Sequence, residues 1–200
     1  MECNNTNGNS TTKIIDITQE LFTSKVHTGN IKPSFEKVKT ITNDAYNLTN
    51  IHLCTHNGTH VDAPSHFIKN GRSIDKMSLN LFYGNCIVVE FDKIISDKLF
   101  IKYISKKAER ILFKGNCELE VDTANLITNT DIKLIGVEGQ TIGDKKISRE
   151  IHNILLSKNI VILEGLDLTH VKADKYLLSA FPLKLGSLEG APVRAVLIKN

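Results

Sequence analysis

The chain has 200 residues, of which 41% are hydrophobic and 24% charged, and 25 basic against 22 acidic residues give a net charge of +3. This composition is typical of a globular domain and excludes collagen-like, coiled-coil and wholly disordered proteins. The balanced charge argues against a nucleic-acid-binding protein. No apolar run reaches the roughly 18 to 20 residues that are needed to cross a bilayer.

The first dozen residues, Met1 to Thr12, are almost all polar and rich in Asn and Thr. We predict a disordered polar tail at residues 1–12, followed by one domain over residues 13–200. The tail lacks the basic start and apolar core of a signal peptide. The four cysteines are spaced too widely for a zinc ribbon or a disulfide framework, so we expect free thiols in a cytoplasmic protein.

Short apolar runs alternate with helical stretches in the second half of the chain, which indicates a mixed α/β domain. The predicted strands cover residues 13–18, 51–54, 86–91, 111–113, 132–137, 160–163, 176–185 and 193–198. The predicted helices cover residues 97–108 and 148–158, and Ser148 is the expected N-cap of the second one.

The most informative segment covers residues 56–67, with the sequence HNGTHVDAPSHF. Four of the seven histidines lie between residues 52 and 66. If the chain stays extended here, His56, His60 and Asp62 project to one face, because strand side chains alternate. Two imidazoles and a carboxylate on one face form a natural ligand set for a divalent transition metal.

Three neighbouring residues extend this prediction. Gly58 shares the predicted face and has no side chain, which would leave room for an ion or a substrate between the imidazoles. Pro64 is expected to end the ladder and to turn the chain. The turn would allow His66 to swing back toward the same place.

A site of this kind needs further ligands from elsewhere in the chain. A set of histidines and carboxylates without cysteine suits Zn, Mn, Fe or Co, and these residues do not distinguish among them. Asp62 could bridge two ions, as carboxylates do in many hydrolases. The best candidates for additional ligands are His152 on the second helix and Glu164 at the end of the run at residues 160–163.

Ordinary structural roles compete with these assignments. Single histidines such as His27, His52 and His170 are most simply surface or hydrogen-bonded residues. On spacing alone, His152 is an ordinary helix residue and Glu164 an ordinary charge at a strand end. The cluster differs, because several titratable groups on one face would repel one another if they were merely buried and protonated.

Residues 56–66 are similar to the H-x-G-T-H-x-D-x-P-x-H signature of the cyclase family of metal-dependent hydrolases, which includes bacterial kynurenine formamidase. The match has no gap. Further likeness lies in GVE at 136–138, VILEGL at 161–166, AFPLK at 180–184 and APVRA at 191–195. The resemblance therefore covers about residues 13–199.

The resemblance implies a role for each matching residue. His56, His60 and Asp62 would bind a first metal ion. Asp62 would bridge to a second ion that His152 and Glu164 complete. One or two divalent ions per chain are implied, with zinc favoured and manganese as the alternative.

The resemblance also implies that His66 donates and accepts the proton in catalysis. The implied fold is a compact swivelling β/β/α-type single domain with a mixed sheet. A small molecule is the implied substrate, and the chain would form a homodimer or homotetramer without a nucleic-acid or membrane partner.

One departure affects substrate specificity. In the formamidases of the family, a segment near the N-terminus has an aromatic residue followed by Pro-Gly-Asp, and the aromatic residue packs on the substrate's aryl ring. The corresponding segment here is VHTGN at residues 26–30, and the chain has no Trp. His27 remains a candidate substrate-binding residue, with weaker stacking.

The predicted reaction is hydrolysis of an amide by metal-activated water. The amide would be an aryl formamide such as N-formylkynurenine, from tryptophan catabolism, or a cyclic amide. The alternatives within the family are a lactone or ester hydrolase, an isatin-type lactam hydrolase and a member that binds metal without catalysis.

Two other enzyme classes have less support. A nucleophilic hydrolase would need Ser65 with His66, or Cys54 with His56, but neighbours in sequence rarely have the required geometry and no G-x-S-x-G motif is present. A nucleotide enzyme would need a phosphate-binding loop, and neither G-x-x-x-x-G-K-[ST] nor G-x-G-x-x-G occurs.

Overall fold

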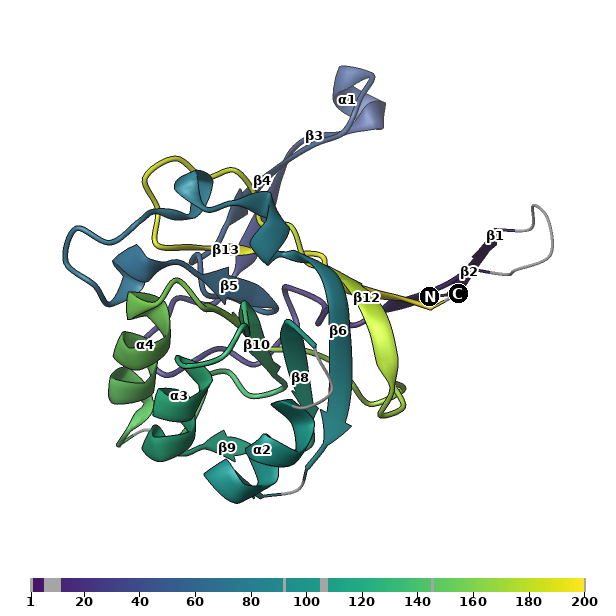
Figure 1. The fold of residues 1–200 in the computed structure, drawn as a ribbon. Helices are drawn as coiled ribbons and strands as arrows, with labels where there is room; N and C mark the ends of the chain where they lie inside the picture. The colour runs from purple at the N-terminus through teal and green to yellow at the C-terminus, as the bar shows by residue number, and fades with distance from the viewer. Residues whose placement is uncertain (1, 6–11, 92, 105–107, 145, 200) are drawn as a thin grey trace.

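A ten-stranded mixed sheet forms the centre of the computed structural model, which describes residues 2–5, 12–91, 93–104, 108–144 and 146–199 (Figure 1). Across the sheet, the strands follow the order β1 (Glu2–Asn5), β2 (Thr12–Asp16), β14 (Val196–Lys199), β12 (Lys175–Ser179), β6 (Tyr83–Glu90), β8 (Arg110–Lys114), β10 (Leu134–Val137), β11 (Val161–Glu164), β5 (His60–Asp62) and β13 (Gly190–Pro192).

Four neighbouring strands in the middle of the sheet, β6, β8, β10 and β11, run parallel, whereas the strand pairs on either side are antiparallel. The parallel strands are connected through α2 (Asp97–Ile104), α3 (Val121–Ile127) and α4 (Ser148–Ser157). These crossovers place helices against a buried sheet, as parallel strands require. The predicted mixed α/β architecture is thus confirmed.

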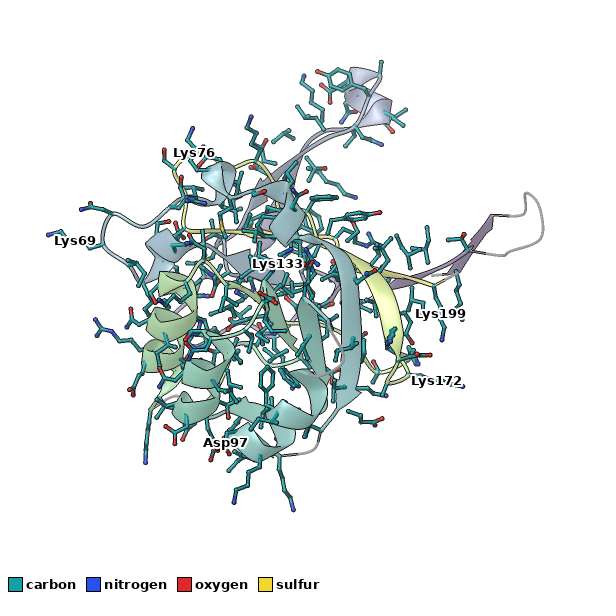
Figure 2. All side chains as sticks on the ribbon, in the orientation of Figure 1. Lys69, Lys76, Asp97, Lys133, Lys172 and Lys199 are labelled. Carbon is teal, nitrogen blue, oxygen red and sulfur yellow. The ribbon has the colours of Figure 1, made fainter. Side chains whose placement is uncertain are left out.

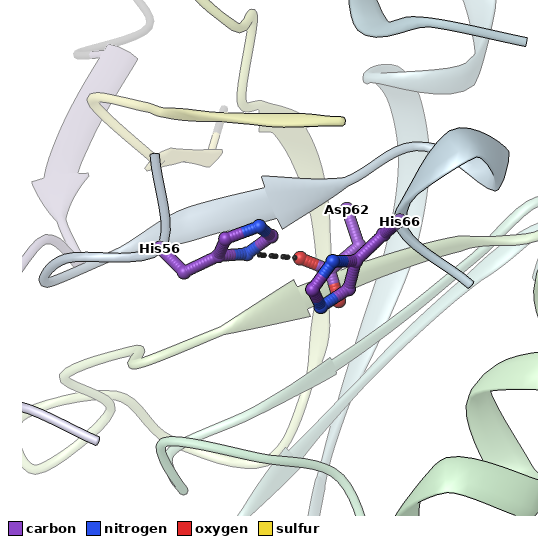
Figure 3. A group of neighbouring side chains, drawn as sticks. All are labelled: His56, Asp62 and His66. Atoms are coloured by element: carbon purple, nitrogen blue, oxygen red, sulfur yellow. Dashed lines mark ion pairs between the residues drawn. The ribbon is translucent and has the colours of Figure 1, made fainter. Parts of the chain in front are cut away.

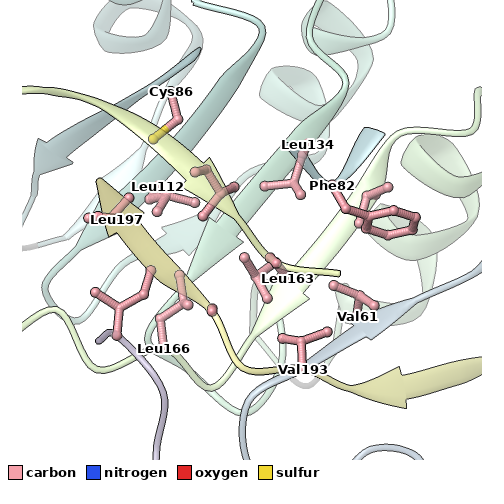
Figure 4. Close-up of a cluster of buried hydrophobic side chains, with 14 of the residues drawn as sticks. Val61, Phe82, Cys86, Leu112, Leu134, Leu163, Leu166, Val193 and Leu197 are labelled. Carbon is pink, nitrogen blue, oxygen red and sulfur yellow. The ribbon is translucent and has the colours of Figure 1, made fainter. Parts of the chain in front are cut away.

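Two hydrophobic cores lie on opposite faces of the sheet. On β8, Ile111 and Phe113 pack in the core that α2, α3 and α4 cover, whereas Leu112 packs in the other core. Leu163 on β11 and Leu197 on β14 belong to the same core as Leu112 (Figure 4). Because side chains alternate along a strand, apolar residues at consecutive positions fill both cores.

The antiparallel strands β3 (Ser34–Lys39) and β4 (Leu48–His52), with the single-turn helix α1 (Ile41–Asp44) between them, project from the body of the molecule (Figure 1). We call residues 34–52 the arm. Large apolar side chains on the arm are exposed, including Ile41 at 65% and Ile51 at 58%. Neither β3 nor α1 was predicted from the sequence.

Two predicted strands need correction. The strand expected at residues 51–54 is β4, which ends at His52. The chain then turns, because the backbone N–H of Cys54 donates to the Asn57 side chain at 2.7 Å and the N–H of Asn57 donates to the Cys54 carbonyl. The strand expected at residues 176–185 ends at Ser179 as β12, three residues before Pro182, which cannot donate to a ladder.

Both predicted helices are present, but the N-cap of the second one was predicted wrongly. The helix expected at residues 97–108 is described as α2 up to Ile104, and residues 105–107 lie outside the described part of the chain. Ile147, which makes no side-chain cap hydrogen bond, is the N-cap of α4. Ser148 is instead the first helical residue. Helix α3 was not predicted, because its seven residues are too few to show a clear helical apolar pattern.

Part of the segment expected to be a disordered tail is a strand, because Glu2–Asn5 pair with β2 as β1. Residues 1 and 6–11 lie outside the described part of the chain. The division of the chain near residue 12 stays a prediction.

Charged side chains point outward on several sides of the molecule, as the labelled Lys69, Lys76, Asp97 and Lys172 show (Figure 2). None of the helices in the described ranges is long and apolar enough to span a membrane. Cys54 and Cys86 carry free thiols as expected.

Candidate metal centre

Strand β5 places His60 and Asp62 on the same face, because they are two residues apart. Its neighbour β11 ends at Glu164, which lies directly opposite His60 in the antiparallel register. The His60 Nε2 atom is 3.6 Å from Asp62 Oδ1 and 3.5 Å from Glu164 Oε2. All three residues are buried, with exposed fractions of 0 to 3%.

His56 reaches the same place by a different route from the one predicted. The chain between β4 and β5 is a turn rather than an extended strand, and Gly58 has a φ of 60°. A Cβ at Gly58 would lie 3.2 Å from Leu21, so this glycine serves the turn and its packing rather than leaving space for an ion. His56 Nδ1 nevertheless lies 2.9 Å from Asp62 Oδ1.

Pro64 turns the chain after β5, as predicted, because it begins a 3-10 helix over Pro64–His66. The turn brings the ring of His66 onto that of His56, with centroids 4.0 Å apart and an interplanar angle of 26°. Figure 3 shows both rings beside the carboxylate of Asp62.

His152 comes from α4, which packs against β11. It is only 2% exposed, and its Nε2 atom lies 3.3 Å from both Asp62 Oδ2 and Glu164 Oε1. The fold thus gathers every residue that the resemblance implies for metal binding. These are His56, His60, Asp62, His152 and Glu164.

Backbone carbonyls orient two of the imidazoles. His60 Nδ1–H donates to the Gly58 carbonyl at 2.9 Å, and His152 Nδ1–H donates to the Ser148 carbonyl at 2.7 Å. Each ring therefore turns Nε2 toward the carboxylates, in the orientation that a metal-ligating histidine adopts. Glu164 is also anchored, because its Oε1 accepts the backbone N–H of Ile142 at 2.7 Å.

The hydrogen bonding of the Asp62 carboxylate indicates whether this cluster suits a cation. Both of its oxygens are buried, and neither accepts a hydrogen bond from the described residues, although three imidazoles surround it. A buried carboxylate without hydrogen bonds is costly unless it binds a cation. The donor set of nitrogen and oxygen atoms therefore fits a divalent transition metal.

The possible ligand atoms of the cluster form two groups, each compact enough to hold an ion. One group consists of His56, Asp62 and His66 and another of His60, Asp62 and Glu164, with the ligand atoms of each group within 4.8 Å of one another. Asp62 belongs to both groups, which suits a bridging carboxylate. The first group contains His66, so the geometry allows His66 to act as a ligand as well as a proton carrier.

The charges in the cluster depend on one another. Burial opposes the charged form of Asp62, but the imidazoles of His152 and His56 outweigh it and hold the pKa of Asp62 well below its usual range. Burial also opposes the charged form of His152, but Asp62 and Glu164 raise its pKa to about 10. At His66, burial prevails and lowers the pKa to about 4. The two carboxylates thus make the interior of the cluster favourable for positive charge.

Comparison with known proteins identifies the family. Residues 15–107 match the family model described as putative cyclase. The kynurenine formamidase of Salinibacter ruber is 34% identical over 169 residues, which cover 76% of this chain and 79% of the formamidase. The chain belongs to the cyclase family. Cyclase-like protein 1 of Oryza sativa is 32% identical, and the alignment covers 76% of this chain but 65% of that protein.

Solved structures share the cyclase-family fold. A predicted metal-dependent hydrolase from Bacillus stearothermophilus has a TM-score of 0.82 at 23% identity, with 96% of this chain and 100% of that chain covered. Isatin hydrolase A from Labrenzia aggregata has a TM-score of 0.82 at 20% identity, with coverage of 94% and 93%. Both confirm the mixed α/β fold.

A cavity of about 390 Å³ opens over the histidines of this cyclase-family protein. His27 and Asn30 line one part of it, and Phe67 and Gln140 line another. The Asn30 side chain donates to the His56 carbonyl at 3.5 Å. His27, the predicted substrate-binding residue, therefore lies at the cavity that the metal cluster faces.

Sequence reasoning missed Glu189, which immediately precedes β13. Its Oε1 lies 3.4 Å from His56 Nε2. The next residue, Gly190, leaves room for that imidazole, because a Cβ there would lie 2.8 Å from His56 Cε1. Both residues stand just before the APVRA segment of the resemblance, which is the one signal that pointed toward them.

The hydroxyl of Ser65 bears on the competing nucleophilic mechanism. Its Oγ is buried and has no hydrogen-bond partner among the described residues. A nucleophilic serine needs a base within hydrogen-bond reach. Ser65 therefore lacks the activation that the alternative with His66 requires.

Proposed function

We propose that this protein is a metal-dependent hydrolase that cleaves a C–N bond of an aryl formamide or a cyclic amide. The observation that carries the proposal is the buried carboxylate of Asp62, which three imidazoles approach without forming a hydrogen bond to it. The kinship with the kynurenine formamidase of Salinibacter ruber supports amide hydrolysis as the reaction.

His56, His60 and Asp62 would hold one ion, and Asp62, His152 and Glu164 a second. Zinc is the first candidate and manganese the second, because both accept nitrogen and oxygen ligands. When bound, a divalent ion lowers the pKa of water to about 7 and polarises a carbonyl group, which supplies a nucleophile and an electrophile at neutral pH.

His66 would move the proton. Its ring lies against His56 and lines the cavity, so it can reach both a water molecule at the cluster and a leaving group in the cavity. The ring would accept a proton from the water and return it to the departing nitrogen, a contribution of about 10²- to 10⁴-fold in rate. Phe67, whose ring centroid lies 4.3 Å from that of His66, would fix the ring and form an apolar wall.

The shape of the substrate would be determined by the cavity walls. His27 and Phe67 are the aromatic rings available to a flat aryl group. A cyclic amide is the second candidate substrate, because isatin hydrolase A has the same fold. Lactones and esters contain the same electrophilic carbonyl and are tested alongside.

The decisive experiment combines metal analysis with an activity screen on purified protein. We expect one or two divalent ions per chain and turnover of an aryl formamide, isatin or an aromatic lactone. A chelator should abolish turnover, whereas thiol and serine reagents should not. Full activity in metal-free protein would refute the proposal, and bound metal without turnover of any substrate would favour a binding role.

We further propose that two copies associate through the arm, giving a homodimer or a homotetramer built from dimers. Exposed apolar side chains gather on the arm, and contiguous apolar patches usually mark an interaction surface. The exposed members are Phe35, Val38, Ile41, Tyr46, Leu48 and Ile51. A second copy would supply the same apolar surface in return, as a two-fold interface requires.

A further inference from the structure

His56 faces the cluster in a different way from the other imidazoles. His60 and His152 approach the carboxylates with Nε2. His56 approaches Asp62 with Nδ1 instead, at 2.9 Å (Figure 3). Its Nε2 therefore points away from Asp62, and a backbone carbonyl cannot hold this ring through Nδ1 as it does in the other two.

The Nε2 atom of His56 lies near an acidic side chain. It is buried, and no described residue forms a hydrogen bond with it. The Glu189 carboxylate lies on that side of the ring, with Oε1 at 3.4 Å from Nε2. This separation is slightly longer than a standard hydrogen bond, so a small movement of the Glu189 side chain would complete the bond.

Glu189 is itself held against the site from two directions. Its Oε1 accepts a hydrogen bond from the Thr55 hydroxyl at 2.5 Å. Its backbone carbonyl accepts the N–H of Ala63, the residue after Asp62, at 2.8 Å. Thr55 precedes His56 in the chain, so the contacts of Glu189 join the segments on both sides of the turn that carries His56.

We propose that Glu189 is a positioning residue for His56. Its carboxylate accepts the Nε2–H of His56 and keeps the proton on that nitrogen, so that Nδ1 presents its lone pair beside Asp62. The inference rests on the proposed metal centre and adds an outer partner to it. Such partners fix the tautomer of a ligating histidine and raise its basicity, and their loss typically weakens metal binding by about 10- to 100-fold.

The first test measures metal affinity in the full chain by competition with a chromophoric chelator, using Zn²⁺ and then Mn²⁺. We expect Glu189→Ala to raise the Kd by about 10- to 100-fold. Glu189→Gln keeps an acceptor oxygen without the charge and should restore part of the affinity. The control is Glu118→Ala, which removes an exposed carboxylate on β9 (Glu118–Leu119).

The second test follows the Nε2–H proton of His56 by ¹H–¹⁵N NMR of the imidazoles in protein saturated with Zn²⁺, with the signal assigned by its loss in His56→Gln. We expect a slowly exchanging Nε2–H signal in the wild type and Glu189→Gln, and faster exchange of this proton with water in Glu189→Ala. A purely structural role for Glu189 would leave the exchange rate unchanged.

The outcomes separate the two proposals. A wild-type chain that binds neither metal overturns the metal centre itself. A wild-type chain that binds metal, with unchanged Kd and unchanged Nε2–H exchange in Glu189→Ala, overturns the positioning role alone. If Glu189→Ala binds fewer ions at saturation, Glu189 is a ligand, and the positioning role is wrong.

Discussion

The metal cluster buries polar and charged side chains, whereas the arm exposes apolar ones. In the cluster, polar and charged groups are almost completely buried, and hydrogen bonds to backbone groups orient His60, His152 and Glu164. On the arm, large apolar groups are exposed to solvent, with Ile41 at 65% and Ile51 at 58%. Charged groups in the cluster are thus cut off from water, and apolar groups on the arm are in contact with it; both arrangements are unfavourable without a partner.

The difference indicates what each region lacks. Buried carboxylates among imidazoles call for a cation, whereas exposed apolar side chains call for another apolar surface. The two regions are also joined, because β4 of the arm leads directly into the turn that carries His56. We therefore expect changes in the cluster to act on metal and turnover, and changes on the arm to act on assembly.

The largest expected effect comes from Asp62→Asn. The amide has the same shape but no charge, so the charge shared by both ligand groups is lost. We expect the Kd for Zn²⁺ to rise by more than about 100-fold, beyond the usual effect of losing an outer partner. Metal analysis after dialysis measures this, with Asp131→Asn on the exposed surface as the control. Full metal content in Asp62→Asn would contradict the metal centre.

The next effect concerns His66, which the geometry allows as a proton carrier or a ligand. For His66→Gln we expect kcat to fall by about 10²- to 10⁴-fold while the metal content is unchanged. Steady-state kinetics on the active substrate and metal analysis of the same sample provide the two readouts. Loss of metal would show that His66 is a ligand, and His170→Gln at an exposed position is the control.

The sequence predicted most of the cluster because its members stand at offsets that local rules relate. His60 and Asp62 share a face by strand alternation, and Pro64 ends β5. The position of His56 was predicted with the wrong backbone, because nothing local indicates that Asn57 closes a turn with Cys54. His152 and Glu164 were candidate ligands because of their places on a helix and at a strand end, and the family resemblance assigned them to a second ion.

Features that depend on distant contacts could not be predicted. Glu189 meets His56 only because β13 lies beside β5 in the sheet. Strand β3 escaped notice because both of its faces are largely exposed, so it lacks the alternation that a half-buried strand shows. The parallel strands, in contrast, carry long apolar runs because they are buried on both faces.

An effect on assembly should follow from changes on the arm. We expect Ile41→Lys with Ile51→Lys to convert an oligomer into monomers, because two charges would be buried at the proposed interface. Sedimentation velocity measures this, and the free energy of unfolding of the monomer should change by no more than about 0.5 kcal/mol per exposed site. Leu79→Lys is a matched control, since Leu79 is 62% exposed but lies outside the arm. A monomeric wild type would contradict the proposal.

The smallest effect tests a partly buried charge outside the cluster. Asp75 accepts hydrogen bonds from the Ser73 hydroxyl at 2.7 Å and from the backbone N–H of Ser187 at 3.0 Å, in the segment that leads to Glu189. These bonds lower the pKa of Asp75 from 3.8 to about 2. Because the folded-state pKa is the lower one, the carboxylate stabilises the protein above the unfolded value, and this stabilisation is lost as the pH falls toward about 2.

The replacement Asp75→Asn isolates that charge, because the amide oxygen can accept the same hydrogen bonds. We expect its Tm to be lower than the wild-type Tm by no more than a few degrees between about pH 5 and 7, where the carboxylate is charged in both states. The difference should shrink as the pH falls below about 4, because the wild-type side chain then becomes neutral in the unfolded state first. A difference in Tm that does not vary with pH would mean that Asp75 acts through its hydrogen bonds alone, and the charge of this anchor would then contribute nothing to the segment that carries Glu189.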